Sequence, residues 1–383
     1  MERLVITTII LITILGMFRK KMKAFDVAQQ FHLPGKVISA ESYGEGIIND
    51  TYLLEVDAAD NRIILQRINA KVFPQPALIM QNMRVICERA QNKAAIYSVS
   101  DRRDFQLPRI YLANSGEAYW VDDSGHYWRA IAFIEQTKTL SQLANLRQAY
   151  EIGFALGRFH NLIHGIDKIE LHDTLPGFHV TPGYLDDFDS NVHRHESFGN
   201  RSEVDYCLAF IESHRHLAPV LEQAKDELTQ CPIHGDPKLN NILFDVSDDQ
   251  AVSMIDLDTV KPGLIHYDIG DCLRSACNVT GEAASVEQSV IFDMDICHEV
   301  LRGYLSEVYF LCRRDYHFLF DAIRLIPFEL GLRFFTDYLK GDQYFKVSAP
   351  QQNLHRAMVQ FKLTANIEQN ESQLREMIVD LKD

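Results

Sequence analysis

Apolar and polar positions alternate along the first third of the chain in the manner of β-strands. Residues 37–56 indicate a strand, a glycine-containing turn and a second strand, and residues 62–68 a third. Residues 76–97 then place apolar side chains at helical spacing, and two more strands are predicted around residues 115–134. We therefore expect a small antiparallel sheet with one helix, ending near Gln136.

The remainder of the chain is dominated by helical patterns, which begin with residues 139–165. The main interruption is residues 232–258, which indicate a loop, a strand, a turn and a strand, before helices return from about Val286. The sequence predicts an α+β protein, with a small sheet domain over residues 23–136 and a larger, mainly helical domain over residues 137–383 that carries a short hairpin.

Residues 1–22 form a separate leader. The run at residues 4–18, "LVITTIILITILGMF", is shorter than the roughly 20 apolar residues of a membrane-spanning helix, and its basic residues 19–21 follow the apolar core instead of preceding it as in a signal peptide. If the run inserts, this basic cluster keeps the rest of the chain in the cytoplasm. We favour the simpler interpretation that the native start is Met17 or Met22 and that the leader is not part of the native protein, over membrane contact through residues 4–18.

The composition narrows the classes of partner and compartment. Of 383 residues, 46% are hydrophobic and 24% charged, as in an ordinary globular protein. The formal net charge of −15 makes a nucleic acid a poor partner, whereas a small nucleotide can bind where metal ions and local cations meet its phosphates. The seven cysteines form no CxxC pair and are odd in number, which favours reduced thiols and a cytoplasmic protein.

The chemistry is concentrated in the segment "PIHGDPKLNNILFD", residues 232–245. A hairpin turning at "VSDDQ" would bring Asn241 beside Asp256, and an amide oxygen with a carboxylate makes a hard-ligand site for Mg²⁺. Phosphoryl transfer needs such a metal, a group that accepts the hydroxyl proton and a cation near the phosphates. Asp236 has no metal-binding duty in this layout and is the predicted base. Lys238 either contacts the γ-phosphate or is solvated.

Several other polar side chains are expected to have structural roles. His234 is expected to brace the loop through hydrogen bonds instead of titrating in the reaction. Asp268 and Asp271 could bind a second metal, but Asp268 is expected instead to accept hydrogen bonds from the loop backbone, and Arg274 to serve the same scaffold. His160 and His164 have metal-ligand spacing, but no carboxylate in register supports a zinc site.

These segments resemble a known superfamily. "HGDPKLNN" resembles the HxDxxxxN catalytic loop of the aminoglycoside phosphotransferase and choline kinase-like enzymes, which are structural relatives of the protein kinases. "MIDLDTVKPGLIHYDIGD" resembles their metal-binding segment and the YDxGD turn after it. The resemblance implies a protein-kinase-like two-lobe fold, with ATP as the phosphate donor and Mg²⁺ as the metal.

Within that superfamily the chain is most similar to the bacterial N-acetylhexosamine 1-kinase group. The similar segments are residues 48–52, 64–69, 255–263 and 329–345. Members phosphorylate the anomeric hydroxyl of GlcNAc or GalNAc, so the implied partner is a small sugar. One position departs from the group's pattern, because Ile47 stands where a histidine is expected, and this leaves the choice of sugar open.

The resemblance also implies roles for individual residues. Asp236 would be the base, Asn241 and Asp256 the metal ligands, and Arg67 the strand cation that contacts the α- and β-phosphates; Glu88 is available as its acidic partner, although the spacing does not require it. The full set of implied nucleotide-binding residues is Arg67, Gly44, Gly46, Phe133, Ile134, Glu135 and Lys238. The implied sugar-binding residues are Thr259, Arg333, Tyr344 and His179.

Ordinary structural roles compete with several of these assignments. Arg333 would also suit a surface or capping position, and Tyr344 with Phe345 a hydrophobic clasp at a helix end. Two other functions remain open from the sequence: phosphorylation of an amino alcohol such as choline, an aminoglycoside or another metabolite, and a pseudokinase that binds nucleotide without transferring phosphate. The presence of Asp236, Asn241 and Asp256 together argues against the pseudokinase.

Overall fold

The computed structural model describes residues 22–44, 48–59, 61–97, 103–193, 201–282 and 289–382. The leader, Gly46 and Ile47 lie outside these residues, so the expectations for them stay predictions. A search of the described helices finds none with the length and hydropathy needed to cross a membrane. The chain divides into two compact units. The first contains the residues up to Glu88 together with Leu107–Gln136, and the second contains Arg89–Gln106 together with Thr137–Asp383.

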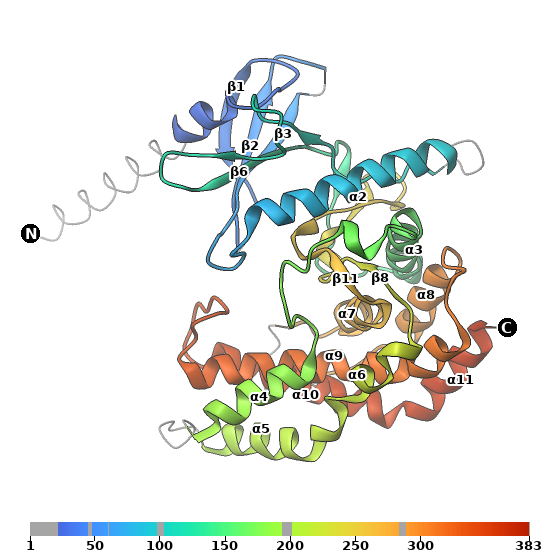
Figure 1. The fold of residues 1–383 in the computed structure, drawn as a ribbon. Coiled ribbons are helices and arrows are strands. Elements are labelled where there is room, and N and C mark those ends of the chain that lie inside the picture. The colour runs from blue at the N-terminus through green and yellow to red at the C-terminus, as the bar shows by residue number, and fades with distance from the viewer. Residues whose placement is uncertain are drawn as a thin grey trace, which may run out of the picture. The chain divides into compact units, whose positions relative to one another are not determined.

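The first unit is built on an antiparallel sheet in the order β1 (Val37–Ser42), β2 (Asp50–Val56), β3 (Arg62–Arg67), β6 (Tyr127–Ala132) and β4 (Ile110–Tyr111), with β5 (Trp120–Val121) also paired to β6 (Figure 1). Burial alternates along the strands, as expected when one face covers a core. Leu54, Ile63, Leu65 and Ala130 are all fully buried, and residues 22–28, which are helical, pack on the same core.

Helix α2 (Pro76–Tyr97) has the bounds that the sequence predicts. Pro76 stands at the first helical position, where the missing N–H of proline costs no hydrogen bond, because an N–H there has no acceptor within the helix. The helix begins in the first unit and ends in the second, where Lys93 Nζ donates to the carbonyls of Asn161 and His164 at 2.8 Å each. Lys93 thereby satisfies carbonyls at the end of α3 that have no partner inside that helix.

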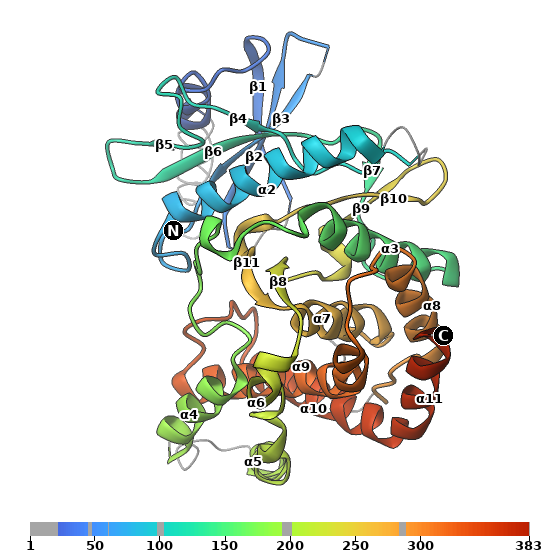
Figure 2. The same cartoon turned by 45° about the vertical axis from the view of Figure 1, so that its right-hand side comes forward.

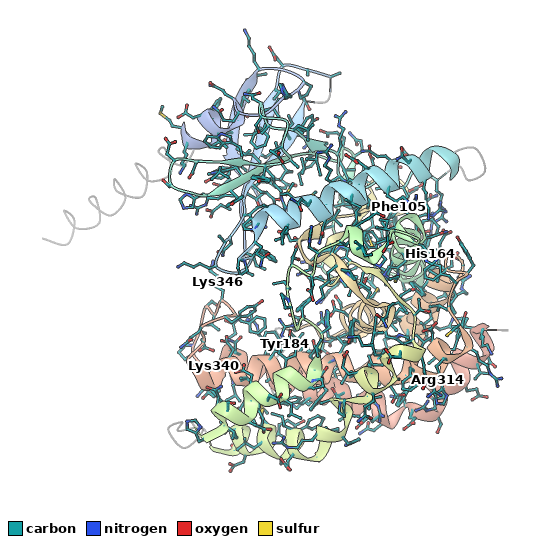
Figure 3. The ribbon with its side chains drawn as sticks, viewed as in Figure 1. Phe105, His164, Tyr184, Arg314, Lys340 and Lys346 are labelled. Atoms are coloured by element: carbon teal, nitrogen blue, oxygen red, sulfur yellow. The ribbon has the colours of Figure 1, made fainter. Side chains whose placement is uncertain are left out.

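The second unit is mainly helical, and α9 (Arg313–Lys340) lies between α7 (Ile265–Cys277) and α10 (Gln352–Gln369) in both views (Figures 1 and 2). The other helices are α3 (Leu146–Ile163), α4 (Thr181–Asn191), α5 (Arg201–His214), α6 (Val220–Ala224), α8 (Met294–Leu305) and α11 (Glu371–Lys382). Helices α3 and α8 cross with their backbones in van der Waals contact. This close approach requires Gly153, because a Cβ at that position would lie 1.8 Å from the Val300 carbonyl oxygen. Phe105 packs edge-on against Phe154 of α3, with ring centroids 6.4 Å apart (Figure 3).

Two small sheets complete the second unit. The predicted hairpin is confirmed as β9 (Ile242–Asp245) and β10 (Ala251–Met254), and β7 (Thr137–Lys138) adds to its edge. A separate antiparallel pair joins β8 (Gln230–Ile233) to β11 (Lys261–Leu264). The short 3₁₀ helices are η1 (Lys168–Glu170), η3 (Arg215–Leu217), η4 (Lys225–Glu227), η5 (Leu239–Asn241) and η6 (Leu257–Thr259).

The structure corrects one local expectation. The YDxGD segment is not a turn but the first half of α7. Ile265, Ile269 and Leu273 are buried at helical spacing, and Gly270 allows α7 to approach α9, because a Cβ there would lie 2.7 Å from the Ala322 carbonyl oxygen. The predicted α+β class is otherwise confirmed.

Candidate active site

The predicted catalytic loop, His234–Asn241, connects β8 to β9 and is held at its start by Asp268 of α7. The amide of His234 donates to Asp268 Oδ2 at 2.6 Å and that of Gly235 to Oδ1 at 2.8 Å, which confirms the predicted scaffold role of Asp268. His160 Nε2 lies 2.8 Å from Asp268 Oδ2. Burial acts to raise the pKa of Asp268, but His160, His234 and the loop amide outweigh it and hold the pKa below its usual value.

His234 braces the loop, as predicted. Its Nε2 lies 3.0 Å from the Ile255 carbonyl oxygen, so Nε2 carries the hydrogen, and its Nδ1 accepts from the Asp236 amide at 3.3 Å. The side chain is fully buried, and this burial lowers its pKa. A neutral imidazole therefore links the loop to the segment that follows β10.

Gly235 occupies a position that only glycine fits well. Its φ is +84°, and a Cβ would lie 2.7 Å from the Thr259 carbonyl oxygen. Thr259, an implied sugar contact, donates its hydroxyl to the His234 carbonyl at 2.7 Å. The peptide before Asp236 is thus enclosed by α7 on one side and η6 on the other.

Asp236 is half-buried and lies beside a cation. Lys238 Nζ is 2.5 Å from Asp236 Oδ2, and Asn241 Nδ2 donates to the Asp236 carbonyl at 2.8 Å and to Oδ2 at 3.3 Å. Burial acts to lower the pKa of Lys238, but the field of Asp236, Asp256 and Asp271 raises it. This lysine pairs with the predicted base instead of being simply solvated.

The hairpin brings the two predicted metal ligands together along the backbone. The Ile255 amide donates to the Asn241 carbonyl at 2.9 Å, so Asn241 lies next to the residue that precedes Asp256. Asp256 follows β10 by two residues, is exposed and has a left-handed φ of 64°, a conformation that asparagine and aspartate tolerate better than most residues.

The donor set fits Mg²⁺. Because Asn241 commits its Nδ2 to Asp236, its amide oxygen is the atom that could bind a cation, and the Asp256 carboxylate supplies a second hard oxygen. The described residues contain no group of three or more His, Cys, Asp or Glu side chains that could hold a metal. Mg²⁺ requires no such group, because it keeps several waters and is bound through one or two protein ligands together with substrate phosphates.

Arg333 of α9 is surrounded by aromatic faces. Its guanidinium carbon lies 5.1 Å from the Phe178 ring, 5.0 Å from Tyr184 and 5.5 Å from Phe345, and Tyr184 lies beside α9 at the start of α4 (Figure 3). Among the described residues, no acceptor lies within hydrogen-bonding distance of this guanidinium. The structure therefore places Arg333 in a half-buried aromatic setting and not at a plain surface or cap.

Tyr344 lies in the segment that leaves α9, and Asp337 fixes this segment. Asp337 Oδ1 accepts from the amides of Gln343 at 3.0 Å and Tyr344 at 2.8 Å, and Oδ2 accepts from Phe345 at 2.9 Å and from Asn353 Nδ2 at 3.1 Å. The Tyr344 side chain is 57% exposed although its ring meets Phe345 edge-on at 4.8 Å. Tyr344 projects, whereas Phe345 packs against Phe334 of α9 with ring centroids 4.5 Å apart, so Phe345 alone serves the expected clasp.

His179, also predicted at the sugar pocket, is buried against the catalytic loop. Its Nε2 lies 2.8 Å from the Gly235 carbonyl oxygen and its Nδ1 3.0 Å from Glu329 Oε1. Both ring nitrogens are therefore occupied by protein acceptors.

Arg67, a predicted nucleotide-binding residue of the first unit, has an ion-pair partner that could not be identified from the sequence. Arg67 of β3 pairs with Asp50, its cross-strand neighbour on β2, whereas Glu88 pairs with Arg84 at 2.7 Å. The antiparallel register of β2 and β3 is the signal that could have found Asp50.

The remaining residues of that set are the glycine turn and the segment after β6. Gly44 has φ +74°, as expected of a turn glycine. Glu135 pairs with Arg62, whose guanidinium also lies 4.2 Å from the Phe133 ring, and Ile134 is buried.

Asp271 is a further buried carboxylate, which the sequence allowed as a ligand of a second metal. Its Oδ1 accepts from Arg274 Nε at 2.7 Å, whereas no partner within the described part of the chain reaches the buried Oδ2. Its charge contributes to the raised pKa values of Lys238, His179 and Arg333, so it lies among these three cations.

Comparison with known proteins shows the family and the fold. Residues 39–299 match the phosphotransferase enzyme family (APH). The microcompartment-associated aminopropanol kinase is similar in structure, with a TM-score of 0.60 at 17% identity over 92% of this chain and 98% of that one. An aminoglycoside phosphotransferase from Alicyclobacillus acidocaldarius has a TM-score of 0.58 at 14% identity, over 92% and 96%.

A choline kinase from Cryptosporidium parvum Iowa II has a TM-score of 0.55 at 12% identity, over 89% and 91% of the two chains. At these identities the neighbours are evidence for the fold alone, and they confirm the predicted kinase-like fold. Together with the family match over most of the catalytic segments, they lead to one conclusion: the chain belongs to the phosphotransferase enzyme family of small-molecule phosphotransferases.

Proposed function

We propose that the protein is an ATP-dependent sugar 1-kinase that phosphorylates the anomeric hydroxyl of an N-acetylhexosamine. The observation that carries the proposal is the fixed setting of Asp236, which follows a peptide anchored by Asp268 and lies beside Lys238 and Asn241. A carboxylate held in this way can accept the proton of a hydroxyl while an amide and a second carboxylate bind the metal.

In the proposed reaction, the anomeric oxygen forms its bond to the γ-phosphorus as the bond to the bridging oxygen of ADP breaks. Asp236 orients the hydroxyl and takes its proton late, because the transition state of phosphoryl transfer is loose and the anomeric hydroxyl is more acidic than an ordinary alcohol. Asn241 and Asp256 would hold Mg²⁺, which supplies charge neutralisation at the phosphates. Lys238, which pairs with Asp236, would contact a phosphate oxygen when nucleotide binds.

Recognition of the sugar is assigned to Arg333 and Tyr344. The guanidinium has donors with no acceptor among the described residues, which suits the hydroxyl and amide oxygens of a neutral sugar. His179 and Thr259 bond to the loop and would act on the sugar through it. Arg67 and Lys238 are proposed at the phosphates, and Gly44, Gly46 and residues 133–135 around the nucleotide.

An amino alcohol is the second candidate acceptor. The Asp271 Oδ2 atom is buried without a hydrogen-bond partner among the described residues, and a carboxylate in that state would suit an ammonium group. The nearby Arg333 opposes this candidate, because it would repel a cationic substrate.

We also propose a cytoplasmic location. All seven cysteines are free thiols, and all but Cys312 are buried, which suits a reducing compartment.

The experiment that tests the function is an ADP-release assay with ATP, Mg²⁺ and a panel of free sugars and amino alcohols. We expect GlcNAc or GalNAc to give the highest kcat/KM, with a sugar 1-phosphate as product by phosphorus NMR. Turnover confined to amino alcohols would establish the second candidate instead. Nucleotide binding without transfer to any acceptor would indicate a pseudokinase.

A further inference from the structure

His179 has an environment unlike that of a substrate-binding histidine. It is 3% exposed and has a left-handed φ of 65°, which is uncommon for a residue other than glycine. Such backbone conformations are strained and persist where surrounding contacts determine them, often at functional sites. The contacts that hold His179 are therefore informative about its role.

The two acceptors fix the protonation state of the ring. A backbone carbonyl can only accept, so the 2.8 Å contact with the Gly235 carbonyl oxygen requires a hydrogen on Nε2. Glu329 Oε1 lies 3.0 Å from Nδ1, and Glu329 Oε2 accepts the Thr181 hydroxyl at 2.7 Å. An ionised Glu329 thus requires a hydrogen on Nδ1 as well, which makes the ring an imidazolium.

Charged groups around the ring support this state. Glu329 of α9 is 1% exposed, and a carboxylate so deeply buried needs a cation or strong donors. Asp271 of α7 adds a second negative charge, while Tyr267 stacks on the ring with centroids 5.4 Å apart and Tyr184 of α4 lies near the His179 backbone. Burial alone would lower the pKa of His179, but Glu329 and Asp271 raise it above its ordinary value.

We propose that His179 is a positioning residue, whose imidazolium bridges Glu329 to the Gly235 carbonyl and so fixes the peptide that leads into Asp236. The proposal rests on the proposed function, in which Asp236 is the base. Gly235 would then be held on both sides, because its amide donates to Asp268 and its carbonyl, which is part of the peptide that leads into Asp236, accepts from His179. The reactivity of the loop would depend on one buried proton.

The sign of the pH dependence follows from the raised pKa. The bridge is intact below the ordinary histidine pKa, and it is lost as pH rises through the higher pKa of the folded protein. A neutral imidazole has one N–H and can serve only one of its two acceptors. We expect kcat to fall on this alkaline limb, roughly tenfold to a hundredfold, while the KM for ATP stays unchanged, because a small displacement of the base costs rate and not nucleotide affinity.

The first test is ¹⁵N NMR of the histidine ring nitrogens, which does not depend on turnover. In the wild-type protein, a resonance with both nitrogens protonated should persist above pH 7 and should be absent from Glu329→Gln. His179→Gln identifies that resonance by its loss, and if this variant does not fold, the Glu329→Gln difference identifies it. A singly protonated His179 at pH 6 would overturn the proposal and leave the proposed function standing.

The second test is the pH profile of kcat. Glu329→Gln should move the alkaline limb to lower pH and reduce kcat roughly tenfold at neutral pH, with KM for ATP unchanged. The matched control is His214→Gln: His214 also has a carboxylate partner, Glu368 at 3.1 Å, and a raised pKa, but it lies on α5 and contacts no loop residue. His214→Gln should alter stability alone. An unchanged limb in Glu329→Gln, or the same shift in His214→Gln, would overturn the proposal.

If no acceptor is phosphorylated, the second test cannot be run but the NMR test remains decisive. An imidazolium in that case would support the bridge and count against the proposed function alone.

Discussion

Backbone groups of the catalytic loop are hydrogen-bonded to buried side chains, whereas the guanidinium of Arg333 is surrounded by aromatic rings. At the loop, the amides of His234 and Gly235 and the Gly235 carbonyl all meet buried side chains within 2.8 Å. Around Arg333, three aromatic rings lie about the guanidinium, and no acceptor among the described residues bonds to it. Under the proposed function, reaction geometry would be fixed by the protein before substrate arrives, whereas Arg333 would keep its donors available for the acceptor.

The largest effect is expected from Asp236→Asn, which tests the catalytic side of this contrast. It should lower kcat by roughly 10²–10⁴-fold, because it removes the proton acceptor without altering side-chain volume. Nucleotide affinity, measured by calorimetry, should stay within about twofold on the same argument that the base does not bind the phosphates. Near-normal turnover would show that the base is another group.

Asp268→Asn should be the next largest change and should act on stability and rate together. Asp268 is fully buried, and an amide cannot accept from both loop amides and His160, so we expect a loss of about 3–5 kcal/mol in the free energy of unfolding at pH 7. Because the folded-state pKa of Asp268 is lowered, its contribution is present above the unfolded value of 3.8 and disappears as pH falls through the folded value. Urea denaturation of both proteins across this range should show the difference narrowing in acid; a constant difference would contradict it.

Arg333→Lys tests the recognition side. A lysine keeps the charge but loses the planar guanidinium, so the KM for the acceptor should rise roughly tenfold to a hundredfold while kcat and the KM for ATP change little. Arg375→Lys on α11 is a matched control, because Arg375 also lies over an aromatic ring, Phe320 at 4.4 Å, but far along the chain from the loop. Equal effects in both variants would exclude a specific role for Arg333.

The smallest expected effect is that of Tyr344→Phe. Removing one exposed hydroxyl should raise the KM for the acceptor about twofold to tenfold, the range of a single neutral hydrogen bond, with no change in stability. Steady-state kinetics with GlcNAc and GalNAc would measure it, and a change confined to one sugar would show which hydroxyl the tyrosine contacts. No change with either sugar would remove Tyr344 from the site.

Elements with a strong local pattern could be predicted from the sequence. Helix α2 has its predicted bounds because apolar spacing and Pro76 agree, and the β9–β10 hairpin follows from two apolar strands around a polar turn. The scaffold role of Asp268 could be anticipated because the loop backbone needed an acceptor.

Elements that depend on partners far away in the sequence could not be predicted in this way. The β8–β11 pair places Pro232 opposite Pro262, and proline within a strand argues against that assignment on local grounds. The partner of Arg67 depends on the register of β2 and β3, and the contact of His179 with Gly235 joins residues 56 positions apart. Such contacts are set by packing of the whole unit, which no short window of sequence contains.

The anchoring of residues 343–345 on Asp337 has a consequence for how acceptor preference could diverge. One carboxylate on α9 accepts three backbone amides of this segment, and these hydrogen bonds do not involve the side chain at position 344. If Tyr344 contacts the acceptor, as proposed, exchanging this one side chain would alter acceptor preference while the backbone of the segment and the catalytic loop keep their hydrogen bonds. We therefore expect a small library at position 344 to yield enzymes that accept other alcohols.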